Sequence, residues 1–334
     1  MKILVLGHSF FLDKLPCEKE IISVGFYDYH KIKLKKAVYR IDYILSLIPW
    51  KPDLIFLGDD SFPIIYIGLE KLEIPIIIYA VDSHIHPWQL YYAHIFDIAL
   101  FAQKFFSEME FNFNYTTIKK WFPLYCNPEA HKKLNLDKVY DVSFVGTLNP
   151  ELNKPRVELI EGIRKKIKNF FVKQGDFVEI YNKSKIVLNQ VANNDINFRF
   201  FEALSCGAFL LSERVIGNGF TEIFKEKEHL DCFEKGNIED AVEKINYYLK
   251  NFEEAKLIAE KGFKYVREKH TITNRAGEFC NLIESINLNE MVHKRLKNLK
   301  DINFFLKMAY ITAAESYSYD KKLSELYLSL ASEL

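Results

Sequence analysis

The chain has 334 residues, of which 49% are hydrophobic and 15% aromatic, so it is long enough for two domains with sizeable cores. Its 45 basic and 45 acidic residues leave no formal net charge, which argues against a bulk electrostatic hold on nucleic acid. The five cysteines are scattered and never spaced C-x-x-C, which argues against a disulfide framework or a cysteine zinc site. With no convincing signal peptide and no apolar run of transmembrane length, we predict a cytoplasmic protein.

Residues 1–125 alternate short apolar runs with segments long enough for helices. The runs have four to eight residues and are rich in β-branched side chains: KILVLG, IISVGFY, PDLIFLG, IPIIIYAV and FDIALFA. Nearly continuous apolar runs of this length are typical of strands buried on both faces of a parallel sheet. Between them, residues 31–51 and 61–72 have room for crossover helices. The pattern predicts an α/β, Rossmann-like domain over residues 1–125.

Polar residues follow two of these predicted strands. Gly7 and His8 follow the first one, where a doubly wound fold places its first binding loop. The full G-x-G-x-x-G fingerprint is absent, so no dinucleotide site is predicted. His8 is either a residue that faces a ligand or an ordinary turn histidine. The acidic pair in residues 58–60, Gly-Asp-Asp, indicates solvated loop acids more than a metal site.

Asp82, His84 and His86 come directly after the apolar run that begins at Ile76, and three interpretations compete for them. A metal-dependent hydrolase would use them as zinc ligands, but zinc requires at least three protein ligands and the remaining histidines fit this role poorly. A structural interpretation makes them the cap of a strand before Pro87 opens a helix. We favour catalysis, with Asp82 as the general base that deprotonates an acceptor hydroxyl and His84 as the next candidate.

The chain after residue 125 contains three further parts. Residues 126–139 carry few periodic apolar positions and are predicted to be a linker. A second α/β pattern then extends over residues 140–285, and two Rossmann-like domains of this kind bind ligands at the carboxyl edges of their strands, in a cleft between them. Residues 286–334 have helical periodicity and no strand pattern. They are expected to form a helical extension of packing helices, with a homodimerising hairpin as the alternative.

The segment from Lys185 to Glu213 carries the most chemical information. Asn197 is a suitable N-cap for a helix that starts at Phe198, and a helix N-terminus attracts phosphate. Arg199 offers a planar pair of donors to phosphate oxygens, and Glu202 offers a carboxylate to a ribose diol. The alternative is a plain ion pair between Arg199 and Glu202, three residues apart on one helix face.

Three ordered motifs in the second half of the chain carry a family resemblance. NFRFFEALSCGAFLLSE, GFTEIFKEKEHLDCF and IAEKGFKYVREKHT together resemble the carboxyl-terminal domain of group 1 glycosyltransferases, in the branch around the spore maturation protein CgeB. The resemblance implies the GT-B fold, with two Rossmann-like domains that face a cleft. It also implies a nucleotide-sugar donor as co-substrate, an acceptor presented by the amino-terminal domain, and neither a bound metal nor another cofactor.

The resemblance assigns donor-binding roles to particular residues. Glu202 matches the second glutamate of the family's Glu-x7-Glu pattern, which contacts the donor ribose, whereas the first glutamate falls on Asn194. The resemblance also matches Thr221 and Glu222, after Gly219, to the donor loop. The remaining donor-binding candidates are placed by their positions at strand ends and at the helix start: Gly7, His8, Gly146, Thr147, Asn197 and Arg199. The missing first glutamate keeps a rival open, a catalytically silent GT-B-like module that binds or assembles. The nucleotide base, the sugar, the acceptor and the stereochemistry are not readable from the sequence.

Overall fold

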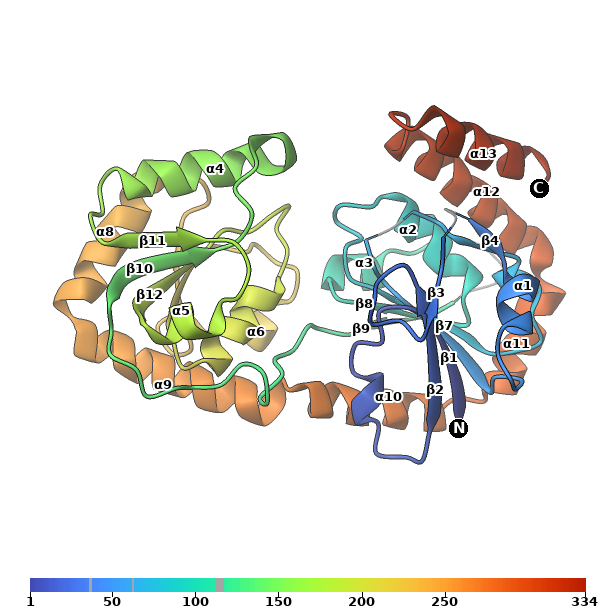
Figure 1. Cartoon of the computed structure of the whole chain (residues 1–334), viewed down its shortest axis with the longest axis horizontal. Coiled ribbons are helices and arrows are strands. Elements are labelled where there is room, and N and C mark those ends of the chain that lie inside the picture. The colour runs from blue at the N-terminus through green and yellow to red at the C-terminus, as the bar shows by residue number, and fades with distance from the viewer. Residues whose placement is uncertain (36–37, 62, 112–116) are drawn as a thin grey trace. The chain divides into compact units, whose positions relative to one another are not determined.

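The computed structural model describes residues 1–35, 38–61, 63–111 and 117–334. The chain divides into two compact units: unit 1 contains Met1–Pro123 and Ala276–Leu334, and unit 2 contains Leu124–Arg275 (Figure 1). The predicted linker, residues 126–139, falls within unit 2, and the predicted boundary at residue 285 falls within unit 1, because residues 276–334 belong to that unit. Within the described ranges, none of the helices combines the length and the apolarity needed to cross a membrane.

Unit 1 is built on a parallel seven-stranded sheet in the order β3-β2-β1-β5-β7-β8-β9. Its strands are β1 (Lys2–Gly7), β2 (Glu20–Gly25), β3 (Ile32–Lys33), β5 (Leu54–Gly58), β7 (Ile76–Ala80), β8 (Ile98–Phe101) and β9 (Ile118–Trp121). A separate parallel pair joins β4 (Tyr39–Arg40) to β6 (Tyr66–Ile67). Every residue of β7 is buried, as is every residue of β8, which confirms that the continuous apolar runs are strands covered on both faces.

The connections in the amino-terminal part of unit 1 are short. Its helical segments are α1 (Ile41–Ser46), α2 (Trp88–Tyr92) and α3 (Lys104–Glu108), together with the 3₁₀ turns η1 (Leu12–Lys14), η2 (Leu69–Lys71) and η3 (Ala93–Ile95). The prediction of a crossover helix over residues 61–72 is wrong for the described residues of that segment, which form β6 and η2; Phe62 lies outside them. Gly68, with φ of +93°, separates the two elements.

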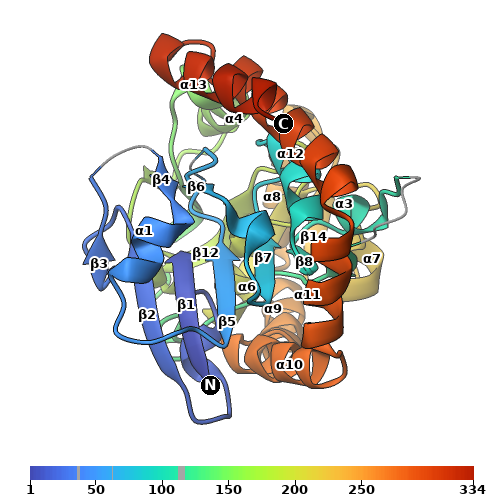
Figure 2. The same ribbon diagram turned by 90° about the vertical axis from the view of Figure 1, so that its right-hand side faces the viewer.

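The carboxyl-terminal helices complete the core of unit 1. They are α10 (Ile272–Glu284), α11 (Leu288–Lys297), α12 (Leu299–Ser316) and α13 (Lys321–Ser332) (Figures 1 and 2). The apolar face of α12, which includes Ile302, Leu306 and Tyr310, joins the same buried cluster as Leu4 and Ile78 of the sheet. The predicted extension 286–334 is therefore part of the unit 1 core, where it packs on the short helix α2. Dimerisation through these helices stays a prediction.

Unit 2 is a second parallel sheet with helices on it, in the strand order β11-β10-β12-β13-β14. The strands are β10 (Tyr140–Val145), β11 (Phe170–Lys173), β12 (Ser184–Asn189), β13 (Phe209–Glu213) and β14 (Asp231–Phe233). The helices are α4 (Pro150–Arg164), α5 (Val178–Asn182), α6 (Phe198–Ser205), α7 (Phe220–Ile223), α8 (Ile238–Lys250) and α9 (Phe252–Lys269). The parallel register brings the carboxyl ends of β10, β12 and β13 to one edge, where the predicted donor residues follow them.

Candidate functional site

Asp59 organises the carboxyl edge of the unit 1 sheet. Its Oδ2 accepts hydrogen bonds from the backbone amides of Val81 and Asp82, at 2.9 and 2.8 Å, and from Gln89 Nε2 at 2.8 Å. Its Oδ1 accepts from the amide of Ser61 at 2.8 Å. The hydrogen bonds of this carboxylate therefore connect the end of β5 to the turn after β7. The prediction of a solvated loop acid is wrong for Asp59, which fixes the position of Asp82.

Asp82, His84 and His86 lie together in that turn, as the strand-end pattern predicts. The hydroxyl of Ser61 donates to Asp82 Oδ2, and the amide of His86 donates to the carbonyl of Asp82 at 2.9 Å. Burial, and then the nearby carboxylate of Asp59, raise the pKa of Asp82. Burial lowers the pKa of His84. A carboxylate with a raised pKa is a stronger proton acceptor once ionised, which suits a general base.

The zinc interpretation of this turn requires a group of at least three ligating side chains. Among the residues that the structure describes, no three or more histidine, cysteine, aspartate or glutamate side chains are grouped so that they could hold a metal ion. The metal-dependent hydrolase therefore gains no support from the geometry of Asp82, His84 and His86.

Gly7 and His8 sit where β1 approaches β5. Gly7 has φ of +82°, and a Cβ at this position would lie 2.3 Å from the carbonyl oxygen of Gly58, so only glycine fits. The exposed His8 donates its backbone amide to Gly58 at 3.3 Å, and its Nδ1 accepts from the amide of Phe10 at 2.8 Å. His8 therefore keeps Nε2 for a partner outside this turn.

Asp60 is a titratable group whose setting the sequence did not predict. Its side chain is only 7% exposed, and its Oδ1 accepts from the Tyr29 hydroxyl at 3.4 Å. His30 Nε2 lies 3.8 Å from its Oδ2 and 3.1 Å from the carbonyl oxygen of Gly7. Burial and the charge of Asp59 raise the pKa of Asp60 to about 7. The signal for it was the paired acids directly after a buried strand.

Helix α6 begins at Phe198, as predicted, but Asn197 does not cap it as expected. The Asn197 backbone is extended and its carbonyl accepts from the amide of Phe200 at 3.2 Å, whereas the side chain makes no capping hydrogen bond. Its Oδ1 is buried without a hydrogen-bond partner among the described residues. Such an orphan acceptor at a predicted binding edge indicates a ligand group that donates to it.

Arg199 lies across the carboxyl ends of β10 and β12. Its Nη2 donates to the carbonyl of Val145 at 2.6 Å, its Nη1 to Asn189 Oδ1 at 2.7 Å, and its Nε to the Tyr181 hydroxyl at 3.2 Å. The guanidinium also stacks on the ring of Phe144, 4.8 Å from its centroid. A guanidinium has five N–H groups, so one on each Nη is left for an anion.

Gly146 is the glycine that lets Arg199 approach the strand. A Cβ at Gly146 would lie 2.9 Å from Arg199 Nη2 and 3.0 Å from Phe144 Cζ. The neighbouring Thr147 accepts a hydrogen bond on its Oγ1 from Gln174 Nε2 at 3.0 Å. Gly146 and Thr147 therefore lie at the same strand end as Arg199. Because Gly146 has no side chain, it leaves room for the guanidinium of Arg199.

Arg156 is a second guanidinium at this edge that the sequence reasoning missed. Its Nε donates to Gln190 Oε1 at 2.8 Å, its Nη1 lies 3.5 Å from the carbonyl of Thr147, and its Cζ lies 6.0 Å from the centroid of the Phe144 ring. Burial, followed by the charge of Arg199, lowers the pKa of Arg156. Two cations that share one aromatic ring form a site for an anion.

The local sequence before Arg156 contains the signal that could have located it. Asn153 departs from helical geometry inside α4, with φ of −154°, and its Oδ1 accepts from the amide of Arg156 at 3.0 Å. The regular part of the helix thus begins after Asn153, with Pro155 in its first turn. An asparagine cap followed by proline and arginine places the arginine at the start of a helix, close to the strand end.

Glu202 lies one turn into α6. Its carboxylate forms no ion pair with Arg199 in the described structure, because the nitrogens of Arg199 donate elsewhere. Burial raises the pKa of Glu202 to about 7, and the charge of Arg199 partly opposes this effect. The plain surface ion pair is therefore not formed, and a desolvated carboxylate remains in the electrostatic field of Arg199.

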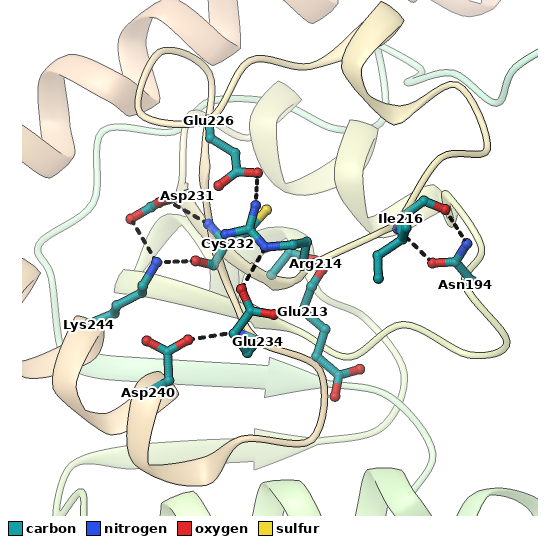
Figure 3. Close-up of polar contacts among 11 residues, drawn as sticks. Asn194, Glu213, Arg214, Ile216, Glu226, Asp231, Cys232, Glu234, Asp240 and Lys244 are labelled. Carbon is teal, nitrogen blue, oxygen red and sulfur yellow. Dashed lines mark hydrogen bonds and ion pairs between the residues drawn. The ribbon is translucent and has the colours of Figure 1, made fainter.

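Asn194, the position of the family's first glutamate, has a structural role here (Figure 3). Its Oδ1 accepts from the amide of Ile216 at 2.8 Å and its Nδ2 donates to the carbonyl of Ile216 at 2.7 Å. Asn194 has φ of +64°, a conformation that asparagine tolerates better than glutamate. Its amide therefore holds the loop before α7 in place.

The loop that Asn194 clamps turns through three consecutive left-handed residues. Gly217, Asn218 and Gly219 have φ of +66°, +50° and +77°. Gly219 precedes α7, on which Thr221 and Glu222 are exposed. These predicted donor-loop residues are therefore accessible, and glycine is needed where the backbone turns.

Buried and paired acids hold the neighbouring loops in place (Figure 3). Glu213, at the end of β13, is 2% exposed, and its carboxylate accepts from the amides of Val191 and Gly236 at 2.8 and 3.0 Å. Arg214 pairs with two carboxylates, those of Glu226 and Glu234. These contacts fix the loops that follow β12, β13 and β14, so the edge of the unit 2 sheet is preorganised.

Comparisons with known proteins agree with this arrangement. A family model described as glycosyl transferase-like matches residues 132–281, which is most of unit 2. No curated protein gives a significant sequence match to the chain.

Several solved structures share the fold. A glycosyltransferase from Rickettsia africae superimposes with a TM-score of 0.61 at 10% identity, over 87% of this chain and 98% of that one. Anabaena HepE in complex with UDP and glucose superimposes with a TM-score of 0.63 at 11% identity, over 86% of this chain and 100% of that one. The lipopolysaccharide outer core galactosyltransferase WaaB superimposes with a TM-score of 0.53 at 13% identity, over 85% of this chain and 99% of that one. The prediction of a GT-B fold is confirmed, whereas the assignment to the CgeB branch stays a prediction.

Proposed function

We propose that this protein is a glycosyltransferase that moves a sugar from a nucleotide-sugar donor to an acceptor hydroxyl without a metal ion. The observation that carries the proposal is the pair of guanidinium groups, Arg199 and Arg156, whose Cζ atoms lie 4.8 and 6.0 Å from the centroid of the Phe144 ring at the carboxyl edge of unit 2. Two fixed cations stabilise the nucleoside diphosphate that leaves the sugar, which is the task that a metal ion performs elsewhere. The family match and the shared fold support the same reaction class.

The donor would be bound mainly by unit 2. Arg199 keeps two N–H groups for phosphate oxygens, and the orphan Oδ1 of Asn197 accepts from a hydroxyl or amide of the ligand. The Glu202 carboxylate accepts two hydrogen bonds from the ribose diol. Gly146 and Gly219 allow the backbone to approach the donor, while Thr147, Thr221 and Glu222 supply further polar contacts. Because HepE has been crystallised with UDP-glucose, UDP-glucose is the first donor to test.

Donor affinity should rise with pH through the titration of Glu202. The pKa of Glu202 is raised to about 7, so the carboxyl is protonated at pH 6 and ionised at pH 8. Only the ionised form accepts both hydrogen bonds from the ribose diol. We expect the UDP-glucose dissociation constant of the wild type to fall about tenfold from pH 6 to pH 8 and that of Glu202→Gln to stay flat. Isothermal titration calorimetry at several pH values, with and without EDTA, measures both.

The matched control for Glu202 is Glu268→Gln, in a glutamate of unit 2 whose side chain is 69% exposed, which should keep the pH dependence of the wild type. A wild-type affinity that does not change with pH would contradict the role of Glu202. An affinity that EDTA abolishes would contradict the metal-independent mechanism. No binding of any nucleoside diphosphate or nucleotide sugar would overturn the proposed function itself.

The acceptor would be activated by unit 1. We propose Asp82 as the general base for an inverting transfer, with His84 and His86 positioning the acceptor and Gly7 and His8 lining the same edge. The raised pKa of Asp82 supports this assignment, because it makes the ionised carboxylate a stronger proton acceptor. The hydrogen bond from Ser61 opposes the rise in pKa and holds the carboxylate in position.

Asp82→Asn should lower the turnover number by about 100-fold or more, since an amide cannot take a proton. The affinity for UDP-glucose should not change, because Asp82 belongs to unit 1. Turnover is measured as UDP release from UDP-glucose in the presence of a panel of glycan acceptors. The control is Asp28→Asn, in an aspartate whose side chain is 93% exposed in unit 1. Equal turnover in Asp82→Asn and wild type would remove Asp82 from the mechanism.

One observation favours a second candidate function, a binding module without turnover. The amide of Asn194 is occupied by Ile216, at the position where the family places a glutamate toward the sugar. A silent module would bind UDP-glucose with the pH dependence described for Glu202 and release no UDP with any acceptor. The turnover measurement therefore separates the two candidates.

A further inference from the structure

Unit 2 has a pocket at the edge of its sheet where the strands begin, away from the carboxyl edge that holds the arginines. The pocket has a volume of about 530 Å³, within the size range of small-molecule sites. Lys185 of β12 and Phe209 of β13 line it near the starts of their strands. The first turns of α9 and residues 133–138 of the linker form its other walls.

The linker wall is held by a buried side chain. Asn182, only 3% exposed, donates from Nδ2 to the carbonyls of Lys132 and Val178, both at 2.8 Å. Its Oδ1 accepts from the amide of Leu134 at 2.6 Å. One asparagine thus ties the linker to the end of α5, and the pocket is formed in the absence of a ligand.

The pocket has an excess of positive charge. Four lysines and two glutamates line it, and Asp141, which is not part of the lining, pairs with Lys185, so one positive charge is not balanced. Three of the lysines have carboxylate partners within 2.7 Å: Lys133 with Glu260, Lys185 with Asp141, and Lys256 with Glu253. The fourth, Lys138, has no carboxylate partner among the described residues and donates to the carbonyl of Asn182 at 2.8 Å.

The setting of Lys138 is electrostatically unfavourable without an anion. Burial, followed by the charges of Lys133 and Lys256, lowers its pKa to about 8. An ammonium that is partly desolvated and repelled by two neighbours gains stability when an anion binds beside it. Lys138 is exposed, so an anion can reach its ammonium from solvent.

An apolar strip runs beside the lysines. Leu134 and Leu136 on the linker and Leu257 on α9 all line the pocket, and Leu257 is 66% exposed. Phe209 and Phe252 also line the pocket. Apolar side chains left in water beside an unbalanced cation favour a ligand that has both an anionic and an apolar part.

We propose that this pocket binds a phosphate monoester that carries an apolar chain, with the phosphate at Lys138 and the chain along Leu134, Leu136 and Leu257. A phosphate monoester carries nearly two negative charges at neutral pH, and one of them would balance the ammonium of Lys138. The ligand is either a lipid headgroup in a membrane surface or a free amphiphilic phosphate, since both present this chemistry. The site does not depend on the proposed glycosyl transfer.

Calorimetric titration of the full chain with octyl phosphate tests the pocket. We expect octyl phosphate to bind about tenfold or more tightly than inorganic phosphate, and neutral octyl glucoside to bind far more weakly than octyl phosphate. Lys138→Gln should lower the affinity for octyl phosphate by about tenfold, because a charge-assisted hydrogen bond is lost. Leu257→Gln should lower the affinity for octyl phosphate and leave the affinity for inorganic phosphate unchanged. Lys166→Gln, in a lysine outside the pocket that pairs with Glu239, should change neither.

The pH dependence and the source of the ligand can be read from the same variants. Affinity for octyl phosphate should fall above pH 8 as Lys138 loses its proton, and Lys138→Gln should lack this fall. Lys138-dependent sedimentation with vesicles of phosphatidylcholine and phosphatidic acid, but not with phosphatidylcholine alone, would assign the ligand to a membrane. Octyl phosphate binding without sedimentation would assign it to a free phosphate ester. Absence of saturable octyl phosphate binding, or equal binding by wild type and Lys138→Gln, would overturn the proposal.

Discussion

Replacing Arg295 by leucine is expected to lower the free energy of unfolding of unit 1 by about 3–5 kcal/mol, the cost of breaking a buried ion pair on one side. Arg295 and its partner Asp97 are both completely buried. Nε and Nη2 of Arg295 lie 3.0 and 3.2 Å from the two carboxylate oxygens, and Nη1 and Nη2 also donate to the carbonyls of Glu70 and Ile74. Leucine would leave one buried charge and three carbonyl oxygens, those of Leu69, Glu70 and Ile74, without these donors.

Urea unfolding followed by tryptophan fluorescence measures this loss specifically, since Trp50, Trp88 and Trp121 all lie in unit 1. Lys294→Leu is the control, in a neighbouring lysine that is 55% exposed and pairs with Glu290, and it should change the free energy of unfolding by less than about 1 kcal/mol. The double variant Asp97→Asn, Arg295→Leu should recover part of the stability, because no charge remains buried. An Arg295→Leu protein as stable as the control would mean that the pair has no stabilising role.

Arg199→Ala should weaken UDP-glucose binding by about 100-fold and also destabilise unit 2 by about 2–3 kcal/mol. The binding loss follows from the two N–H groups that Arg199 keeps for the diphosphate. The stability loss follows from the acceptors that it now satisfies, the carbonyl of Val145 and Oδ1 of Asn189. From the sequence alone the variant would be expected to lose only binding, because the strand ends that Arg199 holds together are far apart in the chain.

Arg199→Lys separates the two roles of this arginine. Lysine keeps the positive charge but cannot donate to Val145, Asn189 and Tyr181 at once, so affinity should fall less than in Arg199→Ala while stability falls similarly. Arg164→Ala, which removes an exposed arginine from the same unit, is the control for both measurements. Calorimetry gives the affinity and chemical unfolding the stability. Unchanged UDP-glucose affinity in Arg199→Ala would remove this residue from the donor site.

Elements that depend on local pattern were predictable from the sequence. The run from Ile76 to Ala80 is buried at every position, because the strand lies between two others and is covered on both faces of the sheet. Its continuous apolar composition predicts this burial. The start of α6 at Phe198 was predictable for a similar reason, since Asn197 and the spacing of the following apolar residues mark it. The ends of the predicted strands also locate Gly146 and Asp82, because each residue comes directly after an apolar run.

Features that depend on distant partners were not predictable. Arg295 lies 198 residues from Asp97 in the chain, and the periodicity of its helix does not tell which surface the helix will cover. The same limit applies to Asn194, whose amide bonds depend on the path of the loop at Ile216, and to Arg156, whose position depends on a kink at Asn153. Arg199 and Glu202 were singled out from the sequence but their partners were not, and Arg156 and Arg295 were missed altogether.

The return of residues 276–334 to unit 1 has a consequence for synthesis on the ribosome. The sheet of unit 1 is complete once Trp121 has been made, yet the apolar face of α12 that covers part of it is encoded after the whole of unit 2. At translation rates of about 5–20 residues per second, the nascent sheet waits on the order of 10–40 s for its last layer. During that interval apolar surface near Leu4 and Ile78 is open to chaperones and to other chains, so premature termination within α12 would leave a product prone to aggregate.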